Sequence, residues 1–133
     1  MAEVYSICCE SSDLAALNQE IDSIAEAEGW SANLVFNVQL VLEELILNIF
    51  THGDNEETRA WLDITPIGDG MRLCLSDNAK PFNILEDSIS PDIDAALDER
   101  SVGGLGVHLV RTLASDLVYE RKDDLNILRL TLK

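Results

Sequence analysis

Strand-like segments in this sequence come in consecutive pairs joined by tight turns, and this pairing constrains the fold more than any other feature. Residues 60–66 and 71–76 form one pair, and residues 116–120 and 125–132 form another. Glycine or aspartate occupies each turn, which suits a short hairpin connection. Consecutive hairpins give antiparallel strands, whereas a doubly wound parallel sheet needs a crossover helix between its strands. The sequence therefore predicts a mixed sheet that is mainly antiparallel.

Helical patterns occupy much of the remaining chain. Residues 4–9 are a β-prone run, and apolar residues at three- and four-residue spacing predict an amphipathic helix over 14–27. A second and unusually apolar helix begins after Ser31, which can cap it, and ends near Gly53. Residues 106–114 are the third predicted helix.

The order of these elements is strand, two helices, hairpin, connection, helix and hairpin. With 133 residues, 47% of them hydrophobic, the chain has enough apolar surface for one continuous core. We therefore predict a single domain over residues 1–133, of the α+β class. Its architecture is a two-layer α/β sandwich with the helices on one face of the sheet.

The chain is strongly acidic, with nine basic and 25 acidic residues and a formal net charge of -16. This charge repels nucleic-acid phosphates and anionic membrane surfaces, so we expect neither as a partner. It attracts a basic protein partner, although acidity also serves solubility.

The cysteines and the apolar runs bear on location in the cell. Cys8, Cys9 and Cys74 are an odd number and lack metal-binding spacing, which predicts reduced thiols. The N-terminus shows no signal-peptide pattern, and no uninterrupted apolar run approaches the roughly 20 residues of a membrane span. We expect a cytoplasmic protein.

Three polar residues interrupt the apolar second helix at one-turn intervals. Glu44, Asn48 and His52 stand at i, i+4 and i+8, which stacks them on one face. A carboxylate there could accept a proton from an attacking hydroxyl, and the Asn48 oxygen could be a ligand for Mg²⁺. The alternative is an ordinary solvated polar stripe.

A strand that ends in Asp77 is the second segment with candidate chemistry. A carboxylate at this position can accept a hydrogen bond from an exocyclic amine such as that of adenine, although aspartate is also a common turn residue. The following residues, about 83–102, are polar and acidic with a weak apolar rhythm. They predict a long, mobile lid over an active site.

A glycine-rich segment precedes the third predicted helix. Gly103, Gly104 and Gly106 would let backbone N–H groups approach a polyphosphate at the start of that helix. The G-K-[ST] phosphate loop is absent, and the dinucleotide-binding fingerprint fails because no strand precedes the glycines. The alternative is a flexible hinge that ends the lid.

Taken together, the three segments resemble the N-box, G1 box and G2 box of the GHKL ATPase superfamily, and especially its anti-sigma regulatory serine/threonine kinases. The resemblance spans nearly the whole chain and implies a Bergerat-type fold with a lid. It implies a general base at Glu44, a Mg²⁺ ligand at Asn48 and an adenine contact at Asp77. The implied phosphate-side backbone is Gly103, Gly104, Leu105, Gly106 and Val107.

The function implied by this resemblance is that of an ATP- and Mg²⁺-dependent serine/threonine kinase that acts as an anti-sigma factor. Such a protein phosphorylates an anti-anti-sigma partner, sequesters a sigma factor and commonly forms a homodimer. Arg100 is a candidate lid contact to the terminal phosphates, with a solvated arginine as the alternative. We expect His52 and His108 to be structural, because no third metal ligand accompanies them.

Two other functions stay open at this point. Ala79 stands where the family commonly has glycine, and Asn83 stands where a carboxylate is frequent. A methyl group at position 79 could narrow the adenine pocket, which favours a nucleotide-binding or nucleotide-free module that only sequesters a partner. The other alternative is a detached ATP-binding domain that acts on histidine together with a second protein.

Overall fold

The computed structural model describes residues 4–53, 56–85 and 102–133, with backbone alone over 102–107. Each predicted helix and strand is present, with small changes at the ends. In chain order the elements are β1 (Tyr5–Cys9), α1 (Leu14–Glu28), α2 (Ala32–Gly53), β2 (Ala60–Ile67), β3 (Gly70–Asp77), α3 (Val102–Leu113), β4 (Ser115–Lys122) and β5 (Leu125–Leu132).

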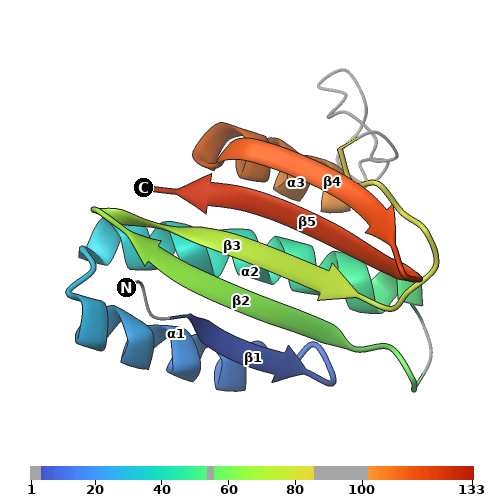
Figure 1. The fold of residues 1–133 in the computed structure, drawn as a ribbon, viewed down its shortest axis with the longest axis horizontal. Helices are drawn as coiled ribbons and strands as arrows, with labels where there is room; N and C mark the ends of the chain where they lie inside the picture. The colour runs from blue at the N-terminus through green and yellow to red at the C-terminus, as the bar shows by residue number, and fades with distance from the viewer. Residues whose placement is uncertain (1–3, 54–55, 86–101) are drawn as a thin grey trace.

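The strands form one five-stranded sheet in the order β1-β2-β3-β5-β4, and all of its described pairs are antiparallel. The helices lie together behind the sheet in Figure 1, so the other sheet face is open. The predicted α+β class and two-layer arrangement are confirmed, while the mixed sheet that we expected is antiparallel throughout the described strands.

Helix α2 carries the centre of the hydrophobic core. Its buried side packs against alternating residues of the central strands, such as Leu62, Leu73 and Leu130. Helix α2 is long and apolar enough to cross a membrane by length and composition alone, but core helices of globular proteins meet the same criterion. The buried residues of α2 are Leu34, Val38, Val41, Leu42, Leu45 and Ile46.

Local sequence signals account for where several elements begin and end. Asp13 caps α1, because its Oδ1 accepts a hydrogen bond from the Ala16 amide at 3.3 Å. Ser31 caps α2 in the same way through the Leu34 amide, at 3.1 Å. Asp123 and Asp124 both have positive φ angles, as a two-residue hairpin turn between β4 and β5 requires.

Helix α3 differs from its prediction in one respect that bears on the glycines. We predicted a helix over 106–114 with the glycines before it, but α3 begins at Val102. A glycine costs a helix only about 1 kcal/mol relative to alanine, so the apolar helical pattern can extend through them. Gly103 and Gly104 therefore lie in the first turn of α3, and Gly106 lies one turn further along.

The predicted lid over residues 83–102 falls mostly outside the described residues, and so does Arg100. At its start, the Asn83 Oδ1 accepts a hydrogen bond from the Leu85 amide at 2.9 Å. The guanidinium of Arg111, on α3, donates to the Leu85 carbonyl. The Arg111 contact attaches the start of the segment to α3.

Candidate nucleotide site

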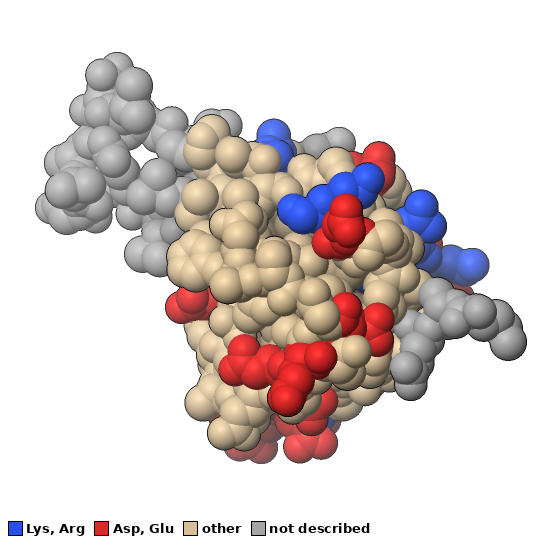
Figure 2. Space-filling model, turned by 90° about the vertical axis from the view of Figure 1, so that its left-hand side faces the viewer, with Lys and Arg blue, Asp and Glu red and all other residues tan. Residues whose placement is uncertain are grey.

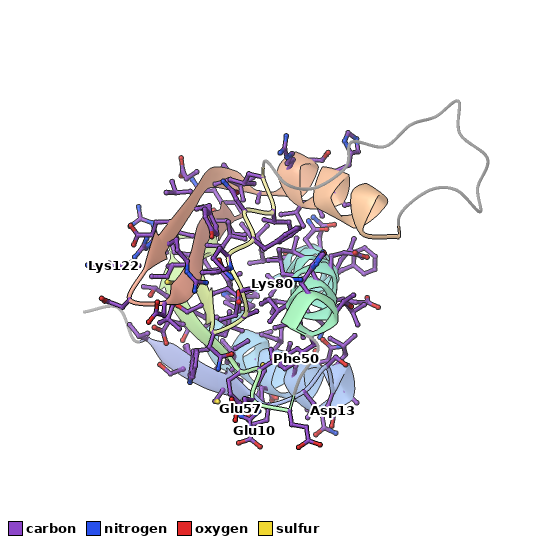
Figure 3. The ribbon with its side chains drawn as sticks, turned by 90° about the vertical axis from the view of Figure 1, so that its right-hand side faces the viewer. Glu10, Asp13, Phe50, Glu57, Lys80 and Lys122 are labelled. Atoms are coloured by element: carbon purple, nitrogen blue, oxygen red, sulfur yellow. The ribbon has the colours of Figure 1, made fainter. Side chains whose placement is uncertain are left out.

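A small cavity lies between the C-terminal half of α2 and the core-facing side of β3, β4 and β5, with a volume of about 40 Å³. Two of the predicted nucleotide-site residues, Asn48 and Asp77, both line it. The loop after β3, which carries Lys80 in Figure 3, runs between the sheet and α2 at this end of the molecule. The full lining is Leu45, Asn48, Ile49, His52, Leu75, Asp77, Ala79, Phe82, Ile84, Tyr119, Asn126 and Leu128.

Asp77 is a buried carboxylate with only one oxygen in use. Its side chain is 7% exposed. Oδ1 accepts hydrogen bonds from the Ala79 amide at 3.0 Å and from the Asn126 Nδ2 at 2.9 Å. Within the described residues Oδ2 accepts none, although buried carboxylate oxygens are normally satisfied. The free oxygen is therefore a ready acceptor for a donor that enters the cavity.

Asn126 organises this part of the cavity, and our sequence reasoning missed it. Its Nδ2 donates to Asp77 and, at 3.0 Å, to the Lys80 carbonyl, while its Oδ1 accepts from the Phe82 amide at 3.1 Å and from the Tyr119 hydroxyl. It thus ties the loop after β3 to β5. A signal was present, because Asn126 begins the apolar series Leu128, Leu130 and Leu132 on the core face of β5.

Burial raises the pKa of Asp77 above the ordinary aspartate range, while its hydrogen bonds to Asn126 and Ala79 and the charge of Arg121 oppose the rise. The carboxylate form is favoured by these three groups and disfavoured by desolvation. Perturbed carboxyl groups in cavities are typical of functional sites.

Asn48 presents its amide group in a defined way. Its Nδ2 donates to the Glu44 carbonyl one turn earlier, at 3.1 Å, so the carbonyl Oδ1 is left for other partners. Oδ1 has no hydrogen bond within the described part of the chain, and Asn48 lines the cavity. An unused amide oxygen is a suitable hard ligand for Mg²⁺.

Glu44 lies one turn from Asn48 on α2 but does not line the cavity. Its side chain is half-buried, and burial raises its pKa, with a further contribution from the charge of Glu43. A carboxylate with a raised pKa is a stronger base than an exposed one, which suits proton transfer near neutral pH.

Two aromatic rings help to keep the cavity small. His52 of α2 and Phe82 of the loop after β3 stack with ring centroids 4.0 Å apart and planes 24° apart. Small-molecule sites usually have volumes of about 300–1,000 Å³. Phe82 and His52 both line the 40 Å³ cavity, so a nucleobase needs more room than the present position of its wall residues leaves.

Ala79 is compatible with the backbone of the loop. It is not among the described residues with positive φ, so no glycine is required there. Its amide donates to Asp77, and its carbonyl accepts from Arg121 at 2.8 Å. The methyl group is buried in the cavity wall, so the substitution narrows the pocket and does not strain the backbone.

Comparison with known proteins agrees with this fold. The chain matches the family of the histidine kinase-like ATPase domain over residues 9–132. It therefore belongs to that family, whose fold and ATP-binding character were expected from the three motif segments. Such a domain fits a soluble protein.

A named relative is the serine/threonine-protein kinase BtrW of Bordetella bronchiseptica. It is 30% identical to this chain over 113 residues, which cover 84% of this chain and 79% of the relative. The name of this relative agrees with the resemblance to serine/threonine kinases seen in the sequence.

Proposed function

We propose that this protein is a cytoplasmic, ATP- and Mg²⁺-dependent serine/threonine kinase that phosphorylates an anti-anti-sigma partner and alternatively sequesters a sigma factor. The observation that carries the nucleotide-binding part is the unused Oδ2 of buried Asp77, in the same cavity as Asn48. The kinase part is supported by the serine/threonine kinase relative and by Glu44 one turn from Asn48.

In this proposal Asp77 selects the base. Its Oδ2 accepts a hydrogen bond from the exocyclic amine of adenine, while Leu75 and Leu128 offer apolar walls for the ring. Guanine has a carbonyl group in place of that amine and would meet the carboxylate with an acceptor. The site therefore favours adenine.

In the same proposal, Asn48 and the start of α3 bind the phosphate groups of ATP, through Mg²⁺ and through backbone N–H groups respectively. The Asn48 Oδ1 would hold Mg²⁺, which when bound neutralises the phosphate charge. The first turn of an α-helix has N–H groups without intrahelical partners, so Gly103 and Gly104 could donate to phosphate oxygens. The proposed phosphate-side backbone continues through Leu105, Gly106 and Val107. Arg100 is a candidate contact from the lid to the terminal phosphates.

Glu44 acts on the acceptor side. Its carboxylate would orient the serine or threonine hydroxyl and accept its proton as the phosphoryl group is transferred. No covalent intermediate with the protein is required.

Removing the amide oxygen of Asn48 tests the magnesium role. We expect Asn48→Ala to weaken Mg·ATP binding at least about tenfold, the loss typical of one charge-assisted contact, and to remove the dependence on Mg²⁺. Calorimetric titrations with and without Mg²⁺ measure both effects. The exposed Asn33, at the start of α2, provides the control Asn33→Ala, which should bind as wild type. Metal-dependent binding that survives in Asn48→Ala contradicts the assignment.

The raised pKa of Asp77 predicts opposite pH effects on folding and on binding. A carboxyl group with a raised folded-state pKa contributes stability that is fully present below the unfolded pKa and is lost as the pH rises through the folded one. The proton would sit on Oδ2, because two donors hold Oδ1, so acid should weaken adenine binding. Urea unfolding and ATP titration, at pH values from below the unfolded-state pKa of Asp77 to above its folded-state pKa, measure the changes in stability and in ATP affinity. If stability and ATP affinity changed in the same direction with pH, the assignment of Asp77 as the adenine contact would be contradicted.

The second candidate function is a module that sequesters its partner with nucleotide as a structural ligand or with none. The observation that favours it is the small cavity, with Ala79 in its wall and Phe82 stacked on His52. Titration of the folded wild type with Mg·ATP separates the candidates, followed by γ-phosphate transfer to candidate antagonist proteins. Absence of nucleotide binding would rule out the kinase, and binding without transfer to any antagonist would favour the module.

A further inference from the structure

The two edges of the sheet differ in how they are protected against pairing with another strand. Edge strand β4 carries the charged residues Asp116, Glu120, Arg121 and Lys122, and its register with β5 shifts between Ser115 and Val118. Charges and bulges are the usual means of protecting a sheet edge. β4 is therefore a poor template for a further strand.

Edge strand β1 has none of these protective features. Its five residues, Tyr5–Cys9, include no charge and no proline, and they pair with β2 in an unbroken register. No described strand pairs with its outer side. The exposed Val4 extends the uncharged run by one residue. The outer side of residues 6–9 therefore offers backbone donors and acceptors to a segment from another molecule.

A groove runs along this free edge, between β1 and α1. It consists of two adjoining hollows of about 560 Å³ and about 280 Å³, both lined by Ile7, Ala16 and Glu20. Tyr5 and Ser23 lie in the first hollow only, and the second continues to Glu10 and Asp13. This β1–α1 groove follows the whole strand, which at about 3.3 Å per residue accommodates an extended segment of five or six residues.

The β1–α1 groove is acidic and has no compensating cation nearby in the sequence. Glu10, Asp13 and Glu20 line it, and the first lysine or arginine of the chain is Arg59. Within the described residues, the one ion pair joins Arg129 to Glu120, on β5 and β4. In Figure 3 Glu10 and Asp13 lie at the lower edge, away from Lys80 and Lys122. Acidic side chains also gather over the lower half of Figure 2, where α1 lies.

These charges decide between two possible occupants of the groove. A second copy of the chain would bring an equally acidic edge against this one, and like charges in apposition are unfavourable. A segment with lysine or arginine would be attracted and would neutralise the three carboxylates.

We propose that the β1–α1 groove binds an extended, lysine- or arginine-bearing segment of a partner protein, which adds to the sheet as a further strand beside β1. Main-chain hydrogen bonds to β1 supply affinity, and the carboxylates of Glu10, Asp13 and Glu20 select basic side chains. The proposal does not depend on the nucleotide site.

Three peptides test the proposal on the full, isotope-labelled chain. The first is a blocked eight-residue peptide that alternates lysine and valine, the second is the same peptide with alternate amides N-methylated, and the third has glutamate in place of lysine. We expect the first to slow hydrogen exchange of alternate β1 amides at least about tenfold, since these amides gain strand hydrogen bonds. The other two should leave β1 exchange unchanged.

Charge reversal at single sites separates the groove from the general acidity of the protein. Glu20→Lys should weaken binding of the lysine peptide about tenfold, whereas Asp69→Lys, the same change on the exposed β2–β3 turn, should weaken it less than about twofold. Equal losses in both variants, or binding without protection of β1, would overturn the proposal. β1 protection that rises with protein concentration in the absence of peptide would instead identify a second copy as the occupant.

Discussion

Asp77→Asn should weaken ATP binding about 100-fold or more while the protein stays folded. A hydrogen bond to a charged group contributes about 1.5–3 kcal/mol, and here it is replaced by an amide that presents a donor to the adenine amine. The asparagine Oδ1 can still accept from the Ala79 amide and the Asn126 Nδ2, which are the two contacts that hold the carboxylate. Binding is therefore lost without loss of the local structure.

The stability of this variant distinguishes a binding role from a structural one. Because burial raises the pKa of Asp77, the ionised carboxylate is a cost to the folded state at neutral pH. We expect Asp77→Asn to resist urea at least as well as wild type. The control is Asp63→Asn on the exposed side of β2, where the side chain accepts a hydrogen bond from Ser6. Unchanged ATP affinity in Asp77→Asn would contradict the proposed adenine contact.

Glu44→Gln should lower phosphoryl transfer by about 10²–10⁴-fold, the usual contribution of a general base, and should leave ATP binding within about twofold. The amide has nearly the same shape but cannot accept the hydroxyl proton. Glu44 does not line the cavity that contains Asn48 and Asp77, so nucleotide affinity should not depend on it. Single-turnover transfer from γ-labelled ATP to an antagonist protein measures the rate.

Glu43→Gln is a close control for this experiment. Glu43 is the exposed neighbour of Glu44 on the same helix, and its substitution removes the same charge. Since the charge of Glu43 contributes to the raised pKa of Glu44, its removal should move the acid limb of the rate profile to lower pH, with little change in the maximal rate. Equal loss of transfer in both variants would mean that the base is not Glu44.

Much of the candidate site could be anticipated because its signals are local. The polar residues of α2 stood out against an apolar helix, and Asp77 stood at the end of a strand bounded by turn residues. Tyr119 and Phe82 were missed, since each looks ordinary within its own segment, and the position of Asn126 on an apolar strand face was overlooked. Their contribution depends on hydrogen bonds and ring contacts between segments that are distant in the chain.

The start of α3 was predicted too late for a related reason. Glycine is a weak helix former, so local propensity placed the start of the helix at Gly106, after Gly103 and Gly104. In the structure α3 packs against α2, and such packing can outweigh the cost of glycine in a first turn.

The sequence by itself determined the number, type and order of the helices and strands, because hydrophobic period and turn chemistry act over a few neighbouring residues. It also determined the acidic character of α1 and α2, which contain no lysine or arginine. The tertiary structure alone decided that β5 lies between β3 and β4, which places Asn126 opposite Asp77. Strand register and side-chain direction determine which residues of neighbouring strands come into contact, and both depend on packing across the whole sheet.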